Sequence, residues 1–138
     1  MNIILLLSAG VDSKLALKRL LTAGNNVVAL CISGKEGNEL KGAKQVAEEN
    51  KIILHVLKLN WYDEQTYDFL QLVCRNMFML FKTIQLALKY KAKIIATGIK
   101  KCDLLDKRLW WVPLFWGLGI LFIHCFGISF FNPIWDEP

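Results

Sequence analysis

The sequence predicts an α/β fold built on an open, doubly wound parallel sheet with helices on both faces. Apolar runs of strand length alternate with stretches of helical periodicity between residues 3 and 98. The runs are continuous rather than alternating, which is typical of strands that are covered on both faces. The order strand, helix, strand joins parallel neighbours through right-handed crossovers, so the helices come to lie on the sheet.

Length and charge limit the classes of protein that the chain can form. With 138 residues it has the size of one domain, and 54% of its residues are hydrophobic. Residues 1–108 hold all 17 Lys and Arg and ten of the 12 acidic residues, a net charge of +7, whereas the remainder carries −2. A net positive charge suits a protein that binds a nucleotide, tRNA or another polyanion. Alternatively, the lysines only form a solvated face of the protein.

Cysteine usage bears on the cellular compartment. The chain has four cysteines and no Cys-x-x-Cys pair, and Met1 leads directly into the first apolar run without a basic leader. We therefore expect a cytoplasmic protein with free thiols.

The first apolar run and the residues after it predict an anion site. The run ends at Leu7, small residues fill positions 8–10, and a helical pattern begins near Asp12 or Ser13. A tight turn of small residues brings backbone N–H groups close to a ligand, and the helix start adds free N–H groups and its positive dipole end. Phosphate is the ligand that this arrangement favours. A plain turn and helix cap, with no ligand, fits the same string.

The turn also resembles a motif of a known superfamily. The PP-loop ATP pyrophosphatases, which include the tRNA thiolases, have a pyrophosphate loop Ser-Gly-Gly-x-Asp-Ser, which is similar to Ser8-Ala9-Gly10-Val11-Asp12-Ser13. The resemblance implies a Rossmann-like, HUP-type sheet. Ala9 stands where the family has glycine, and a methyl group there costs strain or phosphate affinity if the backbone needs a positive φ.

ATP and Mg²⁺ are the cofactors that the resemblance implies. The residues that would hold the phosphates are Ser8, Ala9, Gly10, Val11, Asp12, Ser13 and Lys14. Among them, Asp12 and Ser13 would be catalytic. Because a carboxylate repels phosphate, Asp12 would orient the loop or hold the metal.

The next predicted elements complete the first half of the sheet, in the order strand–helix–strand–helix–strand. Residues 27–32 predict a second buried strand, residues 40–49 a second helix and residues 52–57 a third strand. His55 lies within the third strand, so we predict a packed or hydrogen-bonded side chain rather than a catalytic one. The loop after the second strand is either a plain connection or, by the resemblance, an adenine site flanked by Cys31, Ile32 and Ser33.

A long helix and a fourth strand follow. The helix is predicted over residues 67–90, and the strand over residues 93–98, where it ends in Thr97-Gly98. The apolar residues of the helix are expected to fill its inner side, among them Phe69, Phe78, Phe81 and Leu88.

This second block resembles the thiolase branch of the superfamily. That branch has a cysteine with basic neighbours at a helix start and a strand that ends in Thr-Gly, as in Cys74-Arg75 and Thr97-Gly98. The resemblance implies that Cys74 is a sulfur carrier or nucleophile, and a buried, inert thiol is the alternative. It also implies contacts of Thr97 and Gly98 with ATP. Arg75 and Lys100 would contact the substrate.

The C-terminal stretch is strongly apolar. Residues 109–131 contain no Asp, Glu, Lys or Arg, and this length could span a membrane as a helix. Pro113 and Gly127 interrupt the run, so we expect instead a helix and a strand that complete the core or form an oligomer interface. We therefore divide the chain into a nucleotide-binding domain at residues 1–108 and this helix and strand at residues 109–138.

Together, these features predict an ATP-binding protein that adenylates a substrate and releases pyrophosphate for sulfur or nitrogen transfer, as in tRNA thiolation. Its expected partners are ATP, tRNA or another anionic substrate, and a second copy or a partner subunit. Two other classes stay open. One is a nucleotide-binding module with little or no catalysis, and the other is a small protein anchored in a membrane through residues 109–131.

Overall fold

The computed structural model describes residues 1–8, 10–63, 65–98 and 111–134. Its strands are β1 (Asn2–Leu6), β2 (Asn26–Ser33), β3 (Ile53–Lys58), β4 (Ile94–Ala96) and β5 (Ser129–Phe131). Its helices are α1 (Val11–Thr22), α2 (Asn38–Asn50), α3 (Phe69–Lys89) and α5 (Trp111–His124).

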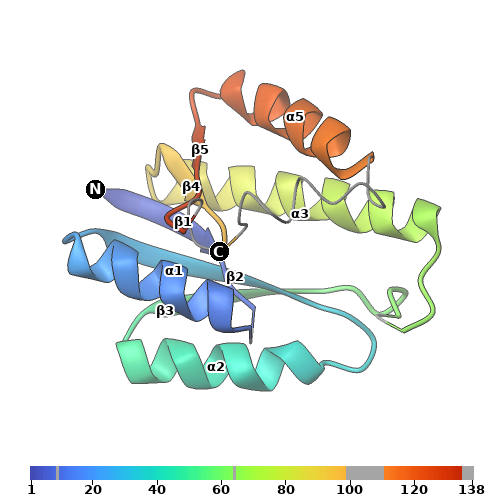
Figure 1. Ribbon diagram of the computed structural model, residues 1–138, viewed down its shortest axis with the longest axis horizontal. Helices are drawn as coiled ribbons and strands as arrows, with labels where there is room; N and C mark the ends of the chain where they lie inside the picture. Colours follow the sequence, from blue (N-terminus) through green and yellow to red (C-terminus); the bar gives the residue numbers. More distant parts are fainter. Residues whose placement is uncertain (9, 64, 99–110, 135–138) are drawn as a thin grey trace.

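The described strands form one parallel sheet with the order β3-β2-β1-β4-β5 (Figure 1). The register places Ile3 of β1 opposite Val27 of β2 on one side and opposite Ile94 of β4 on the other. The predicted fold class, an open parallel sheet with helices on both faces, is confirmed.

Side chains of β1 alternate between two apolar cores, one on each face of the sheet. Ile3 and Leu5 belong to the core that contains residues of α1 and α2, whereas Ile4 belongs to the core that contains residues of α3 and α5. Figure 1 shows the same division, with α1 and α2 on one side of the sheet and α3 and α5 on the other. Burial on both faces explains why this strand is continuously apolar.

The strand β3 lies at the edge of the described sheet and is less buried than its neighbour β2. Residues 27–33 of β2 are all buried, but those of β3 are partly or fully exposed. His55 of β3 has its Nε2 atom 2.8 Å from the hydroxyl oxygen of Tyr90, the C-cap residue of α3. The prediction of a hydrogen-bonded histidine is confirmed.

The helix α3 begins two residues later than predicted because Asp68 caps it. The Asp68 carboxylate accepts a hydrogen bond from the Gln71 N–H at 2.8 Å, and the Gln71 side chain accepts one from the Asp68 N–H at 3.2 Å. The expectation that its apolar residues all face the core is wrong. The helix is apolar around most of its circumference and the sheet covers one side, which leaves exposed fractions of 56%, 50%, 54% and 60% at Phe69, Phe78, Phe81 and Leu88.

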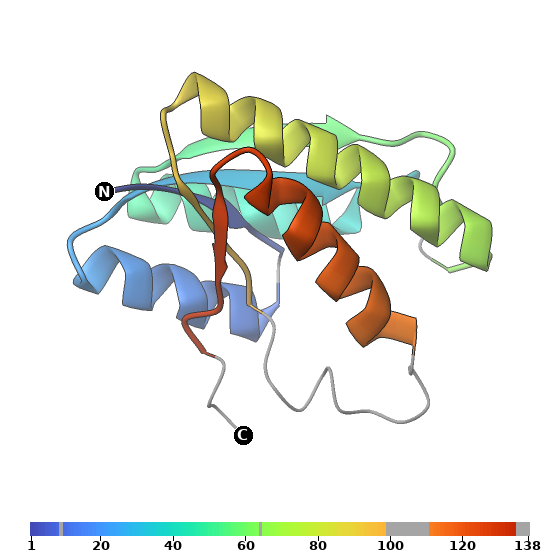
Figure 2. The ribbon, with the colours of Figure 1, turned by 90° about the horizontal axis from the view of Figure 1, so that it is seen from above.

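The C-terminal part forms a helix and then a strand. The strand β5 pairs in parallel with β4, and α5 contacts α3 and β5 (Figure 2). Gly127, with a φ of 73°, turns the chain between them. Beyond β5, the carbonyl oxygen of Pro133 accepts a hydrogen bond from Arg19 of α1 at 2.9 Å. Among the helices of the described residues, none is both long and apolar enough to cross a bilayer.

Candidate functional site

The strand order reverses next to β1. The chain continues from β1 to β2 on one side, while β4 lies on the other side. Open α/β sheets bind ligands in the crevice at such a switch point, outside the carboxyl ends of the strands. The residues that follow β1 and β4 therefore meet where a ligand is expected.

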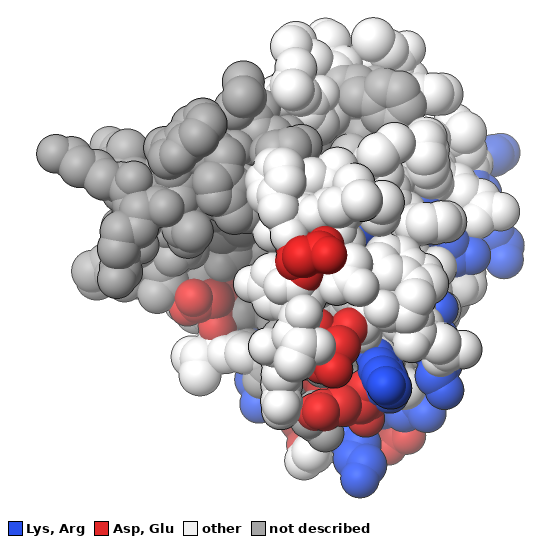
Figure 3. Space-filling model, turned by 90° about the vertical axis from the view of Figure 1, so that its right-hand side faces the viewer, with Lys and Arg blue, Asp and Glu red and all other residues white. Residues whose placement is uncertain are grey.

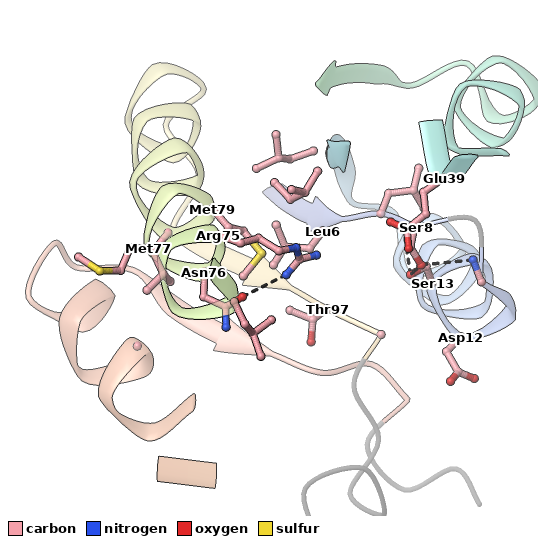
Figure 4. A pocket seen from close by; sticks show the side chains of 18 of the residues that line it. Leu6, Ser8, Asp12, Ser13, Glu39, Arg75, Asn76, Met77, Met79 and Thr97 are labelled. Atoms are coloured by element: carbon pink, nitrogen blue, oxygen red, sulfur yellow. Dashed lines mark hydrogen bonds between the residues drawn. The ribbon is translucent and has the colours of Figure 1, made fainter. Parts of the chain in front are cut away.

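A cavity of about 910 Å³ opens at this position (Figure 4). This volume lies near the upper end of the ~300–1,000 Å³ that small-molecule sites usually have. The segments after β1 and β4 line one side with Ser8, Gly10, Val11, Asp12, Ser13, Thr97 and Gly98. The strands β1 and β2 contribute apolar residues, α2 contributes Glu39, and α3 and α5 form the opposite wall with Arg75, Asn76 and mostly apolar side chains.

Hydrogen bonds between two serines hold the turn after β1. The two hydroxyl oxygens of Ser8 and Ser13 are 2.9 Å apart, and the Ser8 N–H donates to the Ser13 hydroxyl at 3.2 Å. The Ser8 hydroxyl in turn accepts the N–H of Gly10 at 3.2 Å. Ser13 is buried, so its hydroxyl ties the first turn of α1 back to the end of β1.

The start of α1 is open to an anion. Its N-cap residue is Gly10, whose backbone is extended with φ −72° and ψ 158°. A glycine has no side chain to accept hydrogen bonds from the first-turn N–H groups, which serine or aspartate caps usually do. The N–H groups and the positive end of the helix dipole can therefore act on a bound anion in the cavity.

The end of β4 approaches the same helix start very closely. A Cβ atom at Gly98 would lie 3.0 Å from the backbone carbon of Asp12 and 3.0 Å from the backbone nitrogen of Ser13. Such distances are shorter than those of most real Cβ contacts, so any larger residue here would force the backbone of Asp12 and Ser13 to shift by a few tenths of an ångström, and glycine avoids this. Thr97 and Gly98 were predicted as ATP contacts only from the family resemblance. The close approach to α1 gives a physical reason for the glycine.

Asn132 is a residue near the site that the sequence analysis missed. Its side-chain oxygen accepts a short hydrogen bond from the hydroxyl of Thr97, and the Thr97 N–H donates to the carbonyl oxygen of Phe131 at 3.2 Å. The segment after β5 thus fixes the side chain at the end of β4. The signal available in the sequence was the Asn-Pro pair after the last strand, which predicts a turn at a sheet edge.

Arg75 projects from α3 into the cavity, and the Ser8–Ser13 pair lies on the opposite wall (Figure 4). Its Nη1 atom donates to the side-chain oxygen of Asn76 at 3.0 Å, and its guanidinium carbon lies 5.5 Å from the centre of the Tyr62 ring. Arg75, Tyr62 and Glu39 also line a smaller pocket of about 170 Å³ next to Gly34. Tyr62 and Glu39 had no predicted role, although Tyr62 lies in the loop that follows β3 and Glu39 in the first turn of α2, the helix that follows β2.

Solved structures resemble the chain over its whole length. A U34-tRNA thiolase NcsA from Methanococcus maripaludis has a TM-score of 0.70 and 16% identity, and the match covers 100% of this chain and 52% of the thiolase. A predicted subunit of tRNA methyltransferase from Methanocaldococcus jannaschii has a TM-score of 0.65 and 20% identity, with 100% and 70% covered. PH1313 from Pyrococcus horikoshii has a TM-score of 0.59 and 15% identity, with 99% and 38% covered. No family model and no curated protein matches.

The whole-chain superposition on the thiolase, together with the turn after β1 at the switch point, decides the fold. The chain has the fold of this tRNA thiolase over its whole length. It spans about half the length of the thiolase. At these identities the likeness concerns the fold.

The fold brings many of the predicted residues to one cavity and leaves others outside its lining. Ile32 and Arg75 line it together with the described residues of the turn and the end of β4. The lining does not include Lys14, Cys31, Ser33 or Cys74. Ala9 and Lys100 lie outside the described residues.

Three of the residues outside the lining have clear local environments. Cys31 is fully buried in the core beside α1 and α2. Ser33 is also fully buried, and its hydroxyl donates to the carbonyl oxygen of Gly34 at 3.4 Å. Cys74 is half-buried and lies five residues after Phe69, so it does not open the helix as the resemblance suggested.

The thiolase structure contains a [4Fe-4S] cluster, a group that cysteine thiolates hold. In the part of this chain that the structure describes, no group of three or more His, Cys, Asp or Glu side chains is placed to hold a metal. Cys31 is buried, whereas Cys125 is exposed just after α5. The described residues therefore do not fit such a cluster.

Proposed function

We propose that the chain binds ATP with its phosphates at the turn formed by residues 8–13 and adenylates a substrate with release of pyrophosphate. The observation that carries the proposal is the open start of α1 at the switch point, held by the Ser8–Ser13 hydrogen bonds and approached by Gly98. This arrangement offers N–H groups and a positive dipole end to phosphate oxygens. Adenine would lie toward Ile32, at the end of β2.

In the proposed reaction, a substrate oxygen attacks the α-phosphorus of ATP and forms a new O–P bond. The bond from the α-phosphorus to the bridging oxygen breaks, and its electron pair leaves with pyrophosphate. The protein mainly positions the reactants and stabilises the charge of the leaving group. Ser13 and the first-turn N–H groups would hold the phosphates, with Lys14 nearby on the same helix. Asp12 would hold Mg²⁺, which neutralises phosphate charge when bound.

The adenylated substrate would then accept sulfur or nitrogen. The solved structures that share the fold include a tRNA thiolase and a predicted subunit of tRNA methyltransferase, which favours tRNA or another anionic substrate. Arg75, in the cavity wall, would contact that substrate. A role of Cys74 as nucleophile requires access to the cavity, and Cys74→Ser should then abolish transfer while ATP binding is retained.

The proposal is tested with a variant that removes the turn's side-chain interactions. Replacing Asp12 and Ser13 together by Ala should abolish ATP binding, measured by calorimetry with Mg²⁺ present, because the turn loses its hydroxyl bridge and the metal ligand. The matched control is Ser129→Ala, an exposed serine that begins β5 and pairs with the first residue of β4, away from the carboxyl ends of the strands where the site lies. Unchanged ATP affinity in the double variant would contradict the proposal.

Pyrophosphate release separates the enzyme from a binding module. A wild-type protein that binds ATP should release pyrophosphate when its acceptor is present. ATP binding without release of pyrophosphate, whichever acceptor is added, would favour the non-catalytic nucleotide-binding module.

A further inference from the structure

The wall of the cavity that faces the turn is apolar, although polyphosphate needs only polar groups. The part contributed by α3 and α5 consists largely of Leu72, Val73, Met77, Met79, Phe81 and Leu118. Methionine side chains are flexible and polarizable, and they adapt to apolar ligands of irregular shape. This half of the cavity therefore suits a second ligand with an apolar body.

Several of these apolar side chains are more exposed than core residues should be. Exposed fractions are 51% for Met77, 54% for Phe81 and 57% for Leu118. Figure 3 shows the face onto which the strand ends open. Its described upper part is largely uncharged apart from Lys and Arg side chains at the right-hand edge, and the acidic side chains lie in the middle and lower parts. Water-exposed apolar walls of a pocket are a usual sign of a ligand site.

Arg75 gives this apolar wall one positive charge. Among the described residues that line the cavity, it is the cationic one, and the acids Asp12 and Glu39 lie on the α1 and α2 side. One N–H group of Arg75 donates a hydrogen bond to the side-chain oxygen of Asn76, and the guanidinium lies over the Tyr62 ring. The guanidinium has five N–H donors, so further donors remain for a ligand, and their planar fork matches a carboxylate.

We propose that the acceptor substrate is an apolar carboxylic acid. Its carboxylate pairs with Arg75 between α3 and the turn, and its hydrocarbon body lies along the apolar wall of α3 and α5. The reaction step rests on the proposed function: a carboxylate oxygen forms the bond to the α-phosphorus of ATP, and pyrophosphate leaves with the electron pair of the broken bond. The product is an acyl adenylate, a mixed anhydride that an amine or a thiol can attack.

The test uses octanoate, butyrate and 1-octanol as probes, with binding to the full chain measured by calorimetry. Burial of the hydrocarbon should raise the affinity roughly fourfold for each added methylene, so octanoate, with four more methylenes, should bind on the order of 250-fold more tightly than butyrate. Arg75→Gln should weaken octanoate about tenfold or more but leave 1-octanol unchanged, because only octanoate carries the charge. The control Lys82→Gln changes another cation of α3 that does not line the cavity.

Even where octanoate binds, two outcomes would overturn the inference. One is octanoate binding that does not depend on chain length, and the other is an equal loss of octanoate and 1-octanol in Arg75→Gln, which indicates a structural role of Arg75. ATP binding is measured on the same samples. Intact ATP binding without octanoate binding refutes this inference alone, and octanoate binding without ATP binding refutes the proposed function alone. Octanoate-dependent exchange of labelled pyrophosphate into ATP supports both.

Discussion

At the scale of single residues, the site depends on how closely two backbone segments approach each other. Gly98 allows the end of β4 to contact the first turn of α1, where any larger residue would meet backbone atoms of Asp12 and Ser13 at 3.0 Å. Backbone cannot move aside as a flexible side chain can. The position of α1 relative to β4, and with it the width of the phosphate site, is therefore sensitive to this one residue.

Gly98→Ala tests that sensitivity. The added methyl should lower the free energy of unfolding by roughly 1–3 kcal/mol, as overpacking usually does, and should weaken ATP binding by displacing the first turn of α1. The control is Gly117→Ala in α5, where an added Cβ has no atom within 4 Å and alanine should stabilise the helix by up to about 1 kcal/mol. Urea unfolding measures the free energy of unfolding of both variants. Wild-type stability and ATP affinity in Gly98→Ala would contradict the contact.

Some residues of the site could be predicted from the sequence, and others could not. The turn after β1 could be predicted because Ser8 to Ser13 are consecutive and follow an apolar run. The Thr97–Asn132 hydrogen bond joins residues 35 positions apart, and nothing in the local pattern pairs them. Arg75 was named by resemblance, but its support by Tyr62 depends on how α3 lies over the loop after β3.

At the scale of elements, apolar runs predict strands and helices well but not the face that each helix buries. Almost every side of α3 carries apolar residues, so helical periodicity could not select the one that faces the sheet. The structure buries Thr83, Ile84, Leu86 and Ala87 and leaves Phe81 more than half exposed. Packing against β1, β4 and α5 determines which side of α3 is buried, and these contacts join residues that are far apart in the sequence.

The hydrogen bond between His55 and Tyr90 joins β3 to the end of α3 and predicts a pH dependence of stability. Burial, and then the positive charges of Lys89 and Lys82, lower the pKa of His55 below 6.5. The unfolded chain therefore binds a proton more readily than the folded chain. The stabilising contribution of neutral His55 is present above about pH 6.5 and is lost as the pH falls toward the lower folded pKa.

Urea unfolding at about pH 7.5 and about pH 5.5 measures this effect, since the unperturbed histidine pKa of about 6.5 lies between them. The free energy of unfolding of the wild type should be lower at the acidic pH. His55→Asn should reduce the difference. Tyr90→Phe should keep much of it, because the histidine still titrates near both lysines. Equal pH dependence in wild type and His55→Asn would exclude His55 as the cause.

At the scale of the whole molecule, the parallel sheet could be predicted, but the placement of β4 beside β1 could not. That placement creates the switch point and brings α3 and α5 opposite the turn. It also leaves a stripe on α3 exposed. Leu70 and Leu88 share one face of the helix by their spacing, on either side of the cavity-lining Met77 and Phe81, and their exposed fractions are 69% and 60%.

We expect this stripe to make the protein self-associate, because contiguous exposed apolar surface favours association. Sedimentation of the wild type should show a dimer or larger species, and replacing Leu70 and Leu88 by Glu should give a monomer. Neither residue lines the cavity. The control Ile53→Glu changes an exposed apolar residue of β3 and should leave the assembly intact. A monomeric wild type would rule out the stripe as a self-association surface.

In the proposed function, nucleotide phosphates bind at the start of α1, between the ends of β1 and β4. Backbone amide chemical shifts of labelled protein, recorded by NMR during titration with ATP and Mg²⁺, test it most directly. The largest changes should occur at Ser8, Gly10, Val11, Ser13 and Gly98, and AMP, which lacks pyrophosphate, should produce much smaller changes there. Saturating ATP that leaves these amides unchanged, or that shifts mainly residues of β3 or α2, would contradict the account.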